Sequence, residues 1–254
     1  PRRWPPPRPR RDPPRSRARE RALRALLAVP VIVVATVVLA VPALLFGVLD
    51  RSGRLPHAVA RGWASLILAT LGVRVEVSGQ ENLPSGPAVY AANHGSALDI
   101  PILFGHLPVS FRIVHKQSLS LIPFLGWYLF LAGHIAIDRG NAFRAKRSLA
   151  AAAARVRGGT SIVVFPEGTR SPDAAVHLFK RGSFVLAIGS GAPVVPVSLV
   201  GVKRVAPRGI RTLQPGTVRV RIHPPVPTSS RTPDQAETLA AQIRDVVASG
   251  CQAI

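Results

Sequence analysis

The feature that most constrains this chain is a run of 25 residues without a charge, Ala25–Leu49, written ALLAVPVIVVATVVLAVPALLFGVL. A helix of about 20 apolar residues is long enough to cross the hydrocarbon core of a bilayer. The apolar region of a cleaved signal peptide is usually only about 7 to 15 residues long, and no clear small-residue cleavage site follows this run. The run therefore predicts a membrane segment, with a cleaved signal peptide as the alternative.

The residues ahead of this run are strongly basic. Residues 1–24 hold ten arginines and seven prolines against two acids, a formal charge of +8. Such a composition cannot bury enough apolar surface to fold, so it predicts a disordered, extended tail. The net charge of the whole chain is +21, which favours an anionic partner such as a membrane surface, nucleic acid or a phosphorylated substrate. Basic residues beside a membrane segment bind anionic lipids or act as a topology signal, so we expect membrane lipids and no nucleic acid as partners.

A second helical segment, His57–Gly72, follows the apolar run. It carries Arg61 and is too short to span a bilayer comfortably. With Trp63 and a leucine-rich second half, it is typical of a helix that lies in the membrane interface. Residues 25–72 are therefore predicted to form a membrane-anchoring helical hairpin. The alternative is that the second helix packs in the core of the soluble domain.

From Val73 onward, short β-branched runs alternate with helical stretches, which is typical of an α/β fold. Residues 73–254 are thus expected to form one α/β domain. The only cysteine, Cys251, has no partner for a disulfide and belongs to no zinc motif. Strands are expected at Arg74–Ser78, Ala88–Ala92, Phe111–His115, His134–Ile137, Ser161–Phe165, Val194–Val200 and Thr217–His223. Helices are expected at Ile100–Gly105, Ile122–Ala132, Ala142–Arg157, Phe184–Ser190 and Pro233–Ser249.

The first chemical motif is NHGSALD, which places His94 and Asp99 five residues apart behind a predicted strand. On a helix these two side chains would point about 140° apart, so they can meet only in a turn. Pro101 suits the first turn of a following helix. Asp99 could then hold one ring nitrogen of His94 and leave the other as a proton acceptor. The alternative is that Asp99 only caps the helix and His94 only packs.

The residues that usually accompany such a pair are missing from the sequence. There is no G-x-S-x-G nucleophile motif and no further histidine or acid at metal-ligand spacing. Direct removal of a proton from a substrate hydroxyl is therefore favoured over a covalent enzyme intermediate, and no metal site is expected.

The second motif is FPEGTRS, Phe165–Ser171, which follows the apolar strand SIVVF. Gly168 permits a close approach of the backbone to a ligand. Arg170 offers a planar fork of donors for a phosphate. Glu167 could orient a hydroxyl or pair with Arg170. The alternative is an ordinary surface turn that contains a Glu–Arg pair.

Together the motifs resemble those of the glycerolipid acyltransferase family, and most closely its 1-acyl-glycerol-3-phosphate acyltransferases. The resemblance covers Val73–Val200, with the blocks NHGSALD, HIAIDRG, FPEGTRS and GAPVVPVS in order and Phe179–Gly182 similar to an FKxG element. It implies a glycerol-3-phosphate acyltransferase-like sheet flanked by helices, with N-terminal membrane-anchoring helices. Relatives commonly read K-x-E-L where this chain has Lys116–Leu119 (KQSL).

The resemblance also implies an activity. A fatty acyl group would pass from acyl-CoA or acyl-carrier protein to the free hydroxyl of 1-acyl-glycerol-3-phosphate, giving phosphatidic acid without a cofactor. The resemblance implies that His94 is the general base and that Asp99 orients it. The residues implied to bind the acceptor are Lys116, Arg139, Glu167, Gly168, Thr169 and Arg170, with Lys116 and Arg170 on its phosphate. Arg139 has the alternative of a structural pairing with Asp138.

Thioester donors are cytosolic, so the resemblance places the catalytic domain on the cytoplasmic face of the cell membrane. The basic tail should stay on the same side. A single straight crossing would separate the two, so we expect the hairpin over residues 25–72 to be re-entrant. Two other functions remain open. One is acyl transfer to glycerol-3-phosphate, another lysophospholipid or a glycolipid, and the other is a non-catalytic membrane adaptor.

Overall fold

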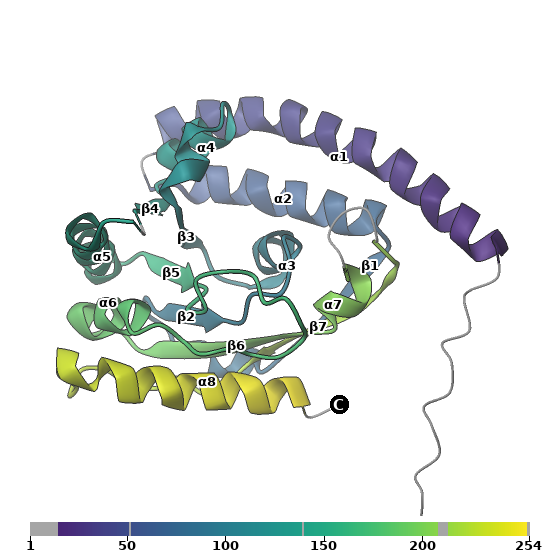
Figure 1. Ribbon diagram of the computed structural model, residues 1–254. Coiled ribbons are helices and arrows are strands. Elements are labelled where there is room, and N and C mark those ends of the chain that lie inside the picture. Colours follow the sequence, from purple (N-terminus) through teal and green to yellow (C-terminus); the bar gives the residue numbers. More distant parts are fainter. Residues whose placement is uncertain (1–14, 51, 139, 208–212, 253–254) are drawn as a thin grey trace, which may run out of the picture.

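A seven-stranded sheet forms the centre of the computed structural model, which describes residues 15–50, 52–138, 140–207 and 213–252 (Figure 1). Its strands are β1 (Val73–Ser78), β2 (Val89–Ala92), β3 (Phe111–Lys116), β4 (Ile135–Ile137), β5 (Ser161–Val164), β6 (Val194–Val200) and β7 (Gly216–Ile222). Their order is β1-β7-β6-β2-β5-β3-β4, and every neighbouring pair is parallel except β6 and β7. Strands β6, β2, β5, β3 and β4 therefore end at the same edge of the sheet. The predicted α/β fold is confirmed, and each predicted strand lies within one residue of its position.

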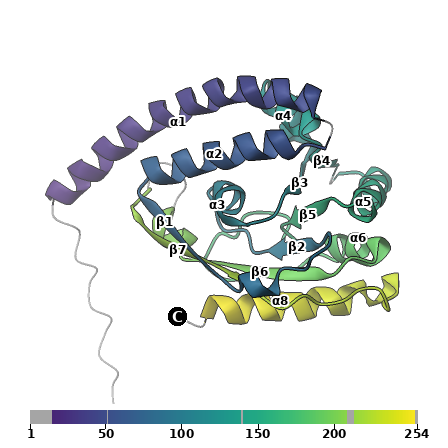
Figure 2. The same ribbon diagram turned by 180° about the vertical axis from the view of Figure 1, so that it is seen from behind.

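Helices cover both faces of the sheet (Figures 1 and 2). One face packs against α2 (Arg54–Thr70) and α3 (Asp99–His106), and the other against α5 (Ala142–Arg157), α6 (Gly182–Ser190) and α8 (Ala236–Gln252). Successive residues of a strand point to opposite faces, so β2 sends Tyr90 into the first core and Val89 and Ala91 into the second. All four β2 residues are buried. A strand covered on both faces explains the uninterrupted apolar run ahead of His94.

Two of the predicted helices begin later than expected. The predicted helix Ile122–Ala132 is realised as α4 (Leu125–Leu131), and the 3-10 turn η2 (Gln117–Leu121) ahead of it was not predicted. Ile122 is extended because the ring of the following proline disfavours a helical conformation there. The predicted helix from Pro233 opens as the 3-10 turn η4 (Pro233–Gln235) ahead of α8. The short elements η1 (Gln80–Asn82) and α7 (Val202–Val205) were not predicted.

The N-terminal region differs from its prediction at one end. Helix α1 spans Arg15–Leu49, so the expectation of a disordered tail is wrong for residues 15–24. Arginine, alanine, leucine and glutamate all favour helix, and the last proline of the tail is Pro14. The rest of the predicted tail, residues 1–14, lies outside the described residues. Among the described residues, one helix is long and apolar enough to cross a membrane, Pro30–Leu49, and only 11% of its 18-residue apolar window is buried.

Helices α1 and α2 lie side by side in both views (Figures 1 and 2). The indole N–H of Trp63 donates to Thr36 Oγ1 at 2.9 Å and bridges the two helices. The other side of α2 buries Ala64 and Leu68 in the core with α3. Residues 25–72 therefore contain two packed helices, and the second also packs in the core of the domain, as the alternative proposed. The anchoring of this pair in a membrane stays a prediction.

Candidate active site

The two chemical motifs meet at the edge where the parallel strands end. Strand β2 ends at Ala92, just before His94, and its neighbour β5 ends at Val164, just before the FPEGTRS loop. Strand β6 lies on the other side of β2. The carboxyl ends of parallel strands are where α/β proteins form ligand sites. The sheet order thus brings together segments that are 73 residues apart in sequence.

Asp99 holds His94 as the spacing predicted. The distance between His94 Nδ1 and Asp99 Oδ2 is 2.8 Å. Asp99 is the first residue of α3 and is fully buried, whereas the His94 side chain is 18% exposed. An ionised carboxylate can only accept hydrogen bonds, so the proton of this contact belongs to Nδ1 and the lone pair to Nε2. The pair therefore presents a basic nitrogen at a partly open position.

Asp99 also fixes the turn that carries His94. Its Oδ2 accepts hydrogen bonds from the backbone N–H groups of Gly95 at 2.8 Å and Ser96 at 2.9 Å. Its side chain thus caps the turn between β2 and α3 as well as holding the imidazole. The imidazole ring stacks on Phe165, with ring centroids 4.2 Å apart. The ring is therefore held by a hydrogen bond at one edge and an aromatic contact on one face.

Glu167 binds the backbone of His94. Its Oε1 accepts the His94 N–H at 2.7 Å, and its Oε2 accepts the His177 N–H at 3.3 Å. The Ser171 N–H donates to the His94 carbonyl at 2.7 Å, so the FPEGTRS loop binds both backbone groups of His94. No Glu167–Arg170 ion pair occurs in the described part of the chain. Burial raises the pKa of Glu167, and the two N–H donors act against that rise.

Asn93 connects the site to β6. It is the first residue of NHGSALD, but the sequence did not indicate this contact. Its Nδ2 donates to the Leu199 carbonyl at 3.0 Å, and its Oδ1 accepts the Leu199 N–H at 2.8 Å. An amide side chain can mimic a backbone pair in this way because it has both a donor and an acceptor. Asn93 therefore extends the ladder between β2 and β6 by one step and fixes the residue before His94.

The FKRG segment covers the FPEGTRS loop. The Lys180 N–H donates to the Pro166 carbonyl at 2.9 Å. Gly168 has a φ of +78°, and a Cβ there would lie 3.0 Å from Lys180 Nζ. Gly168 is thus favoured by its left-handed backbone conformation, and a larger residue there would also displace the end of the Lys180 side chain. Sequence analysis noted FKRG but assigned Lys180 no place in the site.

The remaining predicted acceptor residues lie around this edge. Lys116 is the last residue of β3 and is exposed, as are Thr169 and Arg170. Neither Lys116 nor Arg170 forms an ion pair with another described residue. Arg139 and the alternative pairing with Asp138 lie outside the described residues. Asp138 has Arg144 as an ion-pair partner at 3.5 Å.

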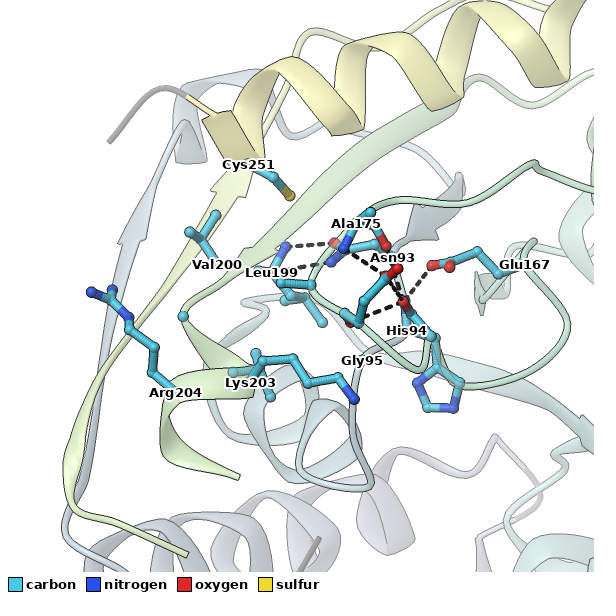
Figure 3. Close-up of a pocket in the computed structure, with 15 residues that line it drawn as sticks. Asn93, His94, Gly95, Glu167, Ala175, Leu199, Val200, Lys203, Arg204 and Cys251 are labelled. Atoms are coloured by element: carbon cyan, nitrogen blue, oxygen red, sulfur yellow. Dashed lines mark hydrogen bonds between the residues drawn. The ribbon is translucent and has the colours of Figure 1, made fainter. Parts of the chain in front are cut away.

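A cavity of about 310 Å³ adjoins the turn that carries His94 (Figure 3). Its lining comes from the NHGSALD turn, the loop after β5, the end of β6 with α7, and the end of α8. In the ranges that the structure covers, no group of three or more His, Cys, Asp or Glu side chains could hold a metal ion.

Comparisons with known proteins point to one family. The sequence profile described as Acyltransferase matches residues 74–200. A 1-acyl-sn-glycerol-3-phosphate acyltransferase of Chlamydomonas reinhardtii is 38% identical over 204 residues, which cover 79% of this chain and 60% of that protein. The human 1-acyl-sn-glycerol-3-phosphate acyltransferase alpha is 35% identical over 177 residues, covering 68% of this chain and 62% of that protein. This chain thus spans about 60% of the length of these curated relatives.

A solved structure shares the fold. The crystal structure of the 1-acyl-sn-glycerophosphate (LPA) acyltransferase PlsC from Thermotoga maritima superposes with a TM-score of 0.76 at 30% sequence identity. The match covers 91% of this chain and 95% of that one. The predicted sheet with flanking helices is therefore confirmed.

Proposed function

The chain belongs to the acyltransferase family, and from that premise we propose that it acylates 1-acyl-glycerol-3-phosphate to give phosphatidic acid. The acyl donor is acyl-CoA or acyl-carrier protein, and no cofactor takes part. One observation carries the proposal: the 2.8 Å contact between His94 Nδ1 and Asp99 Oδ2, inside the segment that matches the family. The names of the relatives support the choice of acceptor.

In the proposed mechanism, His94 Nε2 removes the proton of the acceptor hydroxyl as its oxygen attacks the thioester carbonyl carbon. The carbonyl electrons move to oxygen and form a tetrahedral oxyanion. When the carbonyl re-forms, the carbon–sulfur bond breaks and the thiolate takes the proton from His94. Asp99 stabilises the imidazolium between these steps and keeps Nε2 directed at the substrate. A thioester is already activated, so only the hydroxyl needs this help.

The acceptor is proposed to bind on the β5 and β3 side of His94. Arg170 and Lys116 are exposed cations in segments that follow β5 and end β3, two neighbouring strands. They would hold the acceptor phosphate. Gly168 and Thr169 complete the loop beside it, and Arg139 is proposed from the family resemblance alone. Glu167 contributes by holding His94 and the loop in place through backbone hydrogen bonds.

The segments that connect these strands carry exposed apolar side chains that suit a membrane surface. Leu121 and Phe130, between β3 and β4, are 82% and 81% exposed. Phe143 after β4 and Leu178 after β5 are also exposed. An exposed apolar patch of this kind marks an interaction surface. We therefore propose that α1, α2 and these loops bind one leaflet, so that a lysolipid enters the site from the membrane.

The proposed orientation places the domain and the basic N-terminal residues on the cytoplasmic face. Protease added outside sealed vesicles that display the domain should then digest both parts. Protection of the N-terminal residues while the domain is digested would show a straight crossing of α1 and overturn the re-entrant hairpin.

The experiment that tests the function is His94→Ala, assayed for acyl transfer from labelled acyl-CoA and acyl-carrier protein. We expect a loss of about 100-fold or more in rate, because a positioned base contributes about 10² to 10⁴. His106→Ala is the matched control, since His106 lies at the far end of α3. Membrane association should persist in both variants. Unchanged transfer in His94→Ala would contradict the mechanism.

A panel of acceptors tests the substrate separately. Glycerol-3-phosphate, other lysophospholipids and a glycolipid should be poorer acceptors than 1-acyl-glycerol-3-phosphate. A preference for one of them would change the proposed acceptor but not the proposed acyl transfer. Membrane binding without transfer to any acceptor would favour the adaptor function.

A further inference from the structure

The cavity beside the catalytic turn is lined by neither of the proposed phosphate ligands, Lys116 and Arg170. Strand β2 has β5 on one side and β6 on the other. The cavity extends from the loop after β5 to the end of β6, α7 and the end of α8, and Arg170 and Lys116 are not among its lining residues. A transfer reaction needs two substrates at one base. A cavity that adjoins His94 without the proposed phosphate ligands of the acceptor is therefore a place for the donor.

Lys203 and Arg204 both line this cavity, and Figure 3 shows the Arg204 guanidinium pointing away from His94. Lys203 belongs to α7 and is half-buried. A Cβ added to Gly95 would lie 3.8 Å from Lys203 Cε, so the lysine side chain runs beside the catalytic turn. Figure 3 shows its amino group pointing toward the side of the cavity where the His94 ring lies. Sequence analysis did not single out Lys203.

The carboxyl groups of the cavity have other hydrogen-bond partners and form no ion pair with Lys203. Glu167 accepts hydrogen bonds from the His94 and His177 backbones. Asp173 accepts from Ser171 Oγ, from the Ala175 N–H and from the His177 ring, each at 2.9 Å. Within the described ranges, Lys203 forms no ion pair. A half-buried ammonium without a counter-ion next to a cavity favours an anionic ligand.

Resting on the proposed function, we propose that this cavity receives the phosphopantetheine arm of the acyl donor, with its phosphate on Lys203. The arm and its phosphate are common to coenzyme A and to acyl-carrier protein. Ligand pockets are usually about 300 to 1,000 Å³, and this one, at about 310 Å³, suits a narrow arm rather than a whole nucleotide. The thioester at the end of the arm would then meet His94 from the β6 side.

Kinetics with three donors test the proposal. In Lys203→Ala, the KM for acyl-CoA and for acyl-carrier protein should rise about tenfold or more, because a charge-assisted hydrogen bond to phosphate is lost. The KM for the acceptor should not change, and Lys203→Arg should restore most of the loss. Acyl-pantetheine lacks the phosphate, so its KM should be the same for both enzymes. Lys146→Ala, an exposed lysine on α5, is the matched control.

The kinetic outcomes separate this proposal from its alternatives. An unchanged donor KM, or an equal rise with acyl-pantetheine, would overturn the proposal. A rise in the KM for acyl-CoA alone would show that Lys203 contacts the nucleotide and not the phosphate of the arm. That result would also overturn the proposal. If the wild-type chain transfers no acyl group at all, the proposed function fails, and the occupant of the cavity is still decided by a binding test.

The single cysteine provides that binding test. Cys251 lines the cavity from the end of α8, and Figure 3 shows its thiol pointing inward. Burial raises the pKa of this thiol, so iodoacetamide labelling is run at alkaline pH. An S-alkyl phosphopantetheine and an alkyl-CoA thioether should both slow the labelling, and less so in Lys203→Ala. Adenosine 3′,5′-bisphosphate and glycerol-3-phosphate should not slow the labelling. Protection by the bisphosphate alone, or by none of these compounds, would overturn the proposal.

Discussion

At the scale of single residues, Glu167 couples the two motifs of the site. One oxygen of its carboxyl binds the backbone of His94 and the other binds the backbone of His177. The residue that the family resemblance assigns to the acceptor thus acts in the structure on the position of His94. Because burial raises its pKa, its charge state is also linked to folding.

This linkage gives a pH dependence with a definite sign. Between the ordinary value near 4.5 and its raised pKa, Glu167 holds a proton in the folded protein that the unfolded chain releases. Stability therefore falls as pH rises through that window. Glu167→Gln cannot ionise, so the free energy of unfolding of the variant minus that of the wild type should increase from pH 4.5 upward. Denaturant unfolding in detergent at several pH values measures this difference. A constant difference across the window would contradict the raised pKa.

Part of the site could be predicted from the sequence, but the backbone groups that bind its side chains could not. The His94–Asp99 contact could be predicted because the spacing left a turn as the only geometry that joins them. The bonds from Glu167 to backbone N–H groups could not, since such donors have no signature in a sequence. Lys203 could not be placed either, because it comes to lie beside Gly95 only through the pairing of β6 with β2.

At the scale of elements, the end of α8 closes one side of the site by packing tightly on the sheet. Ser198 Oγ on β6 donates to the Val247 carbonyl at 2.8 Å and shares a hydrogen bond with His223 Nε2, also at 2.8 Å. A Cβ added to Gly250 would lie 2.4 Å from Ser198 Oγ and 2.6 Å from His223 Nε2. Only a glycine fits where the helix crosses this buried polar pair.

Gly250→Ala should therefore destabilise the fold by about 1 to 3 kcal/mol, the usual cost of overpacking a well-packed core. Gly62→Ala is the matched control, because Gly62 lies in helix α2 with no atom within 4 Å of an added Cβ. That change should be neutral or stabilising by up to about 1 kcal/mol. Thermal and denaturant unfolding of both variants measure the contrast. Equal effects of the two substitutions would show that α8 is free to move away from β6.

The elements differ in how far their sequence determines them. Every strand could be predicted because buried β-branched runs bounded by glycine and proline have few alternatives. Helix α7 is only Val202–Val205, too short to show a helical period. The start of α1 at Arg15 was missed because charge and proline content were averaged over residues 1–24, whereas the prolines end at Pro14.

At the scale of the whole molecule, apolar exposure is concentrated around α1 and the site edge. Along α1, the exposed large side chains include Val34, Val37 and Leu49. Helix α4 packs against the end of α1, where a Cβ on Gly47 would lie 2.7 Å from Leu131 Cβ. The apolar surface of α1 is therefore continuous with that of the loop and helix between β3 and β4.

Trp127 on α4 can report whether this surface enters a bilayer. It is 56% exposed, and the other tryptophans of the chain are Trp4 and Trp63. With those two changed to phenylalanine, the emission of Trp127 should shift to the blue on vesicles and be quenched by lipids brominated in their acyl chains, since tryptophan favours the membrane interface. A second variant that lacks Trp127 and carries Glu237→Trp, on α8 across the sheet, should show neither effect. If the brominated lipids do not quench the emission of Trp127, the site edge does not enter the bilayer. The proposed lateral entry of the lysolipid would then be wrong.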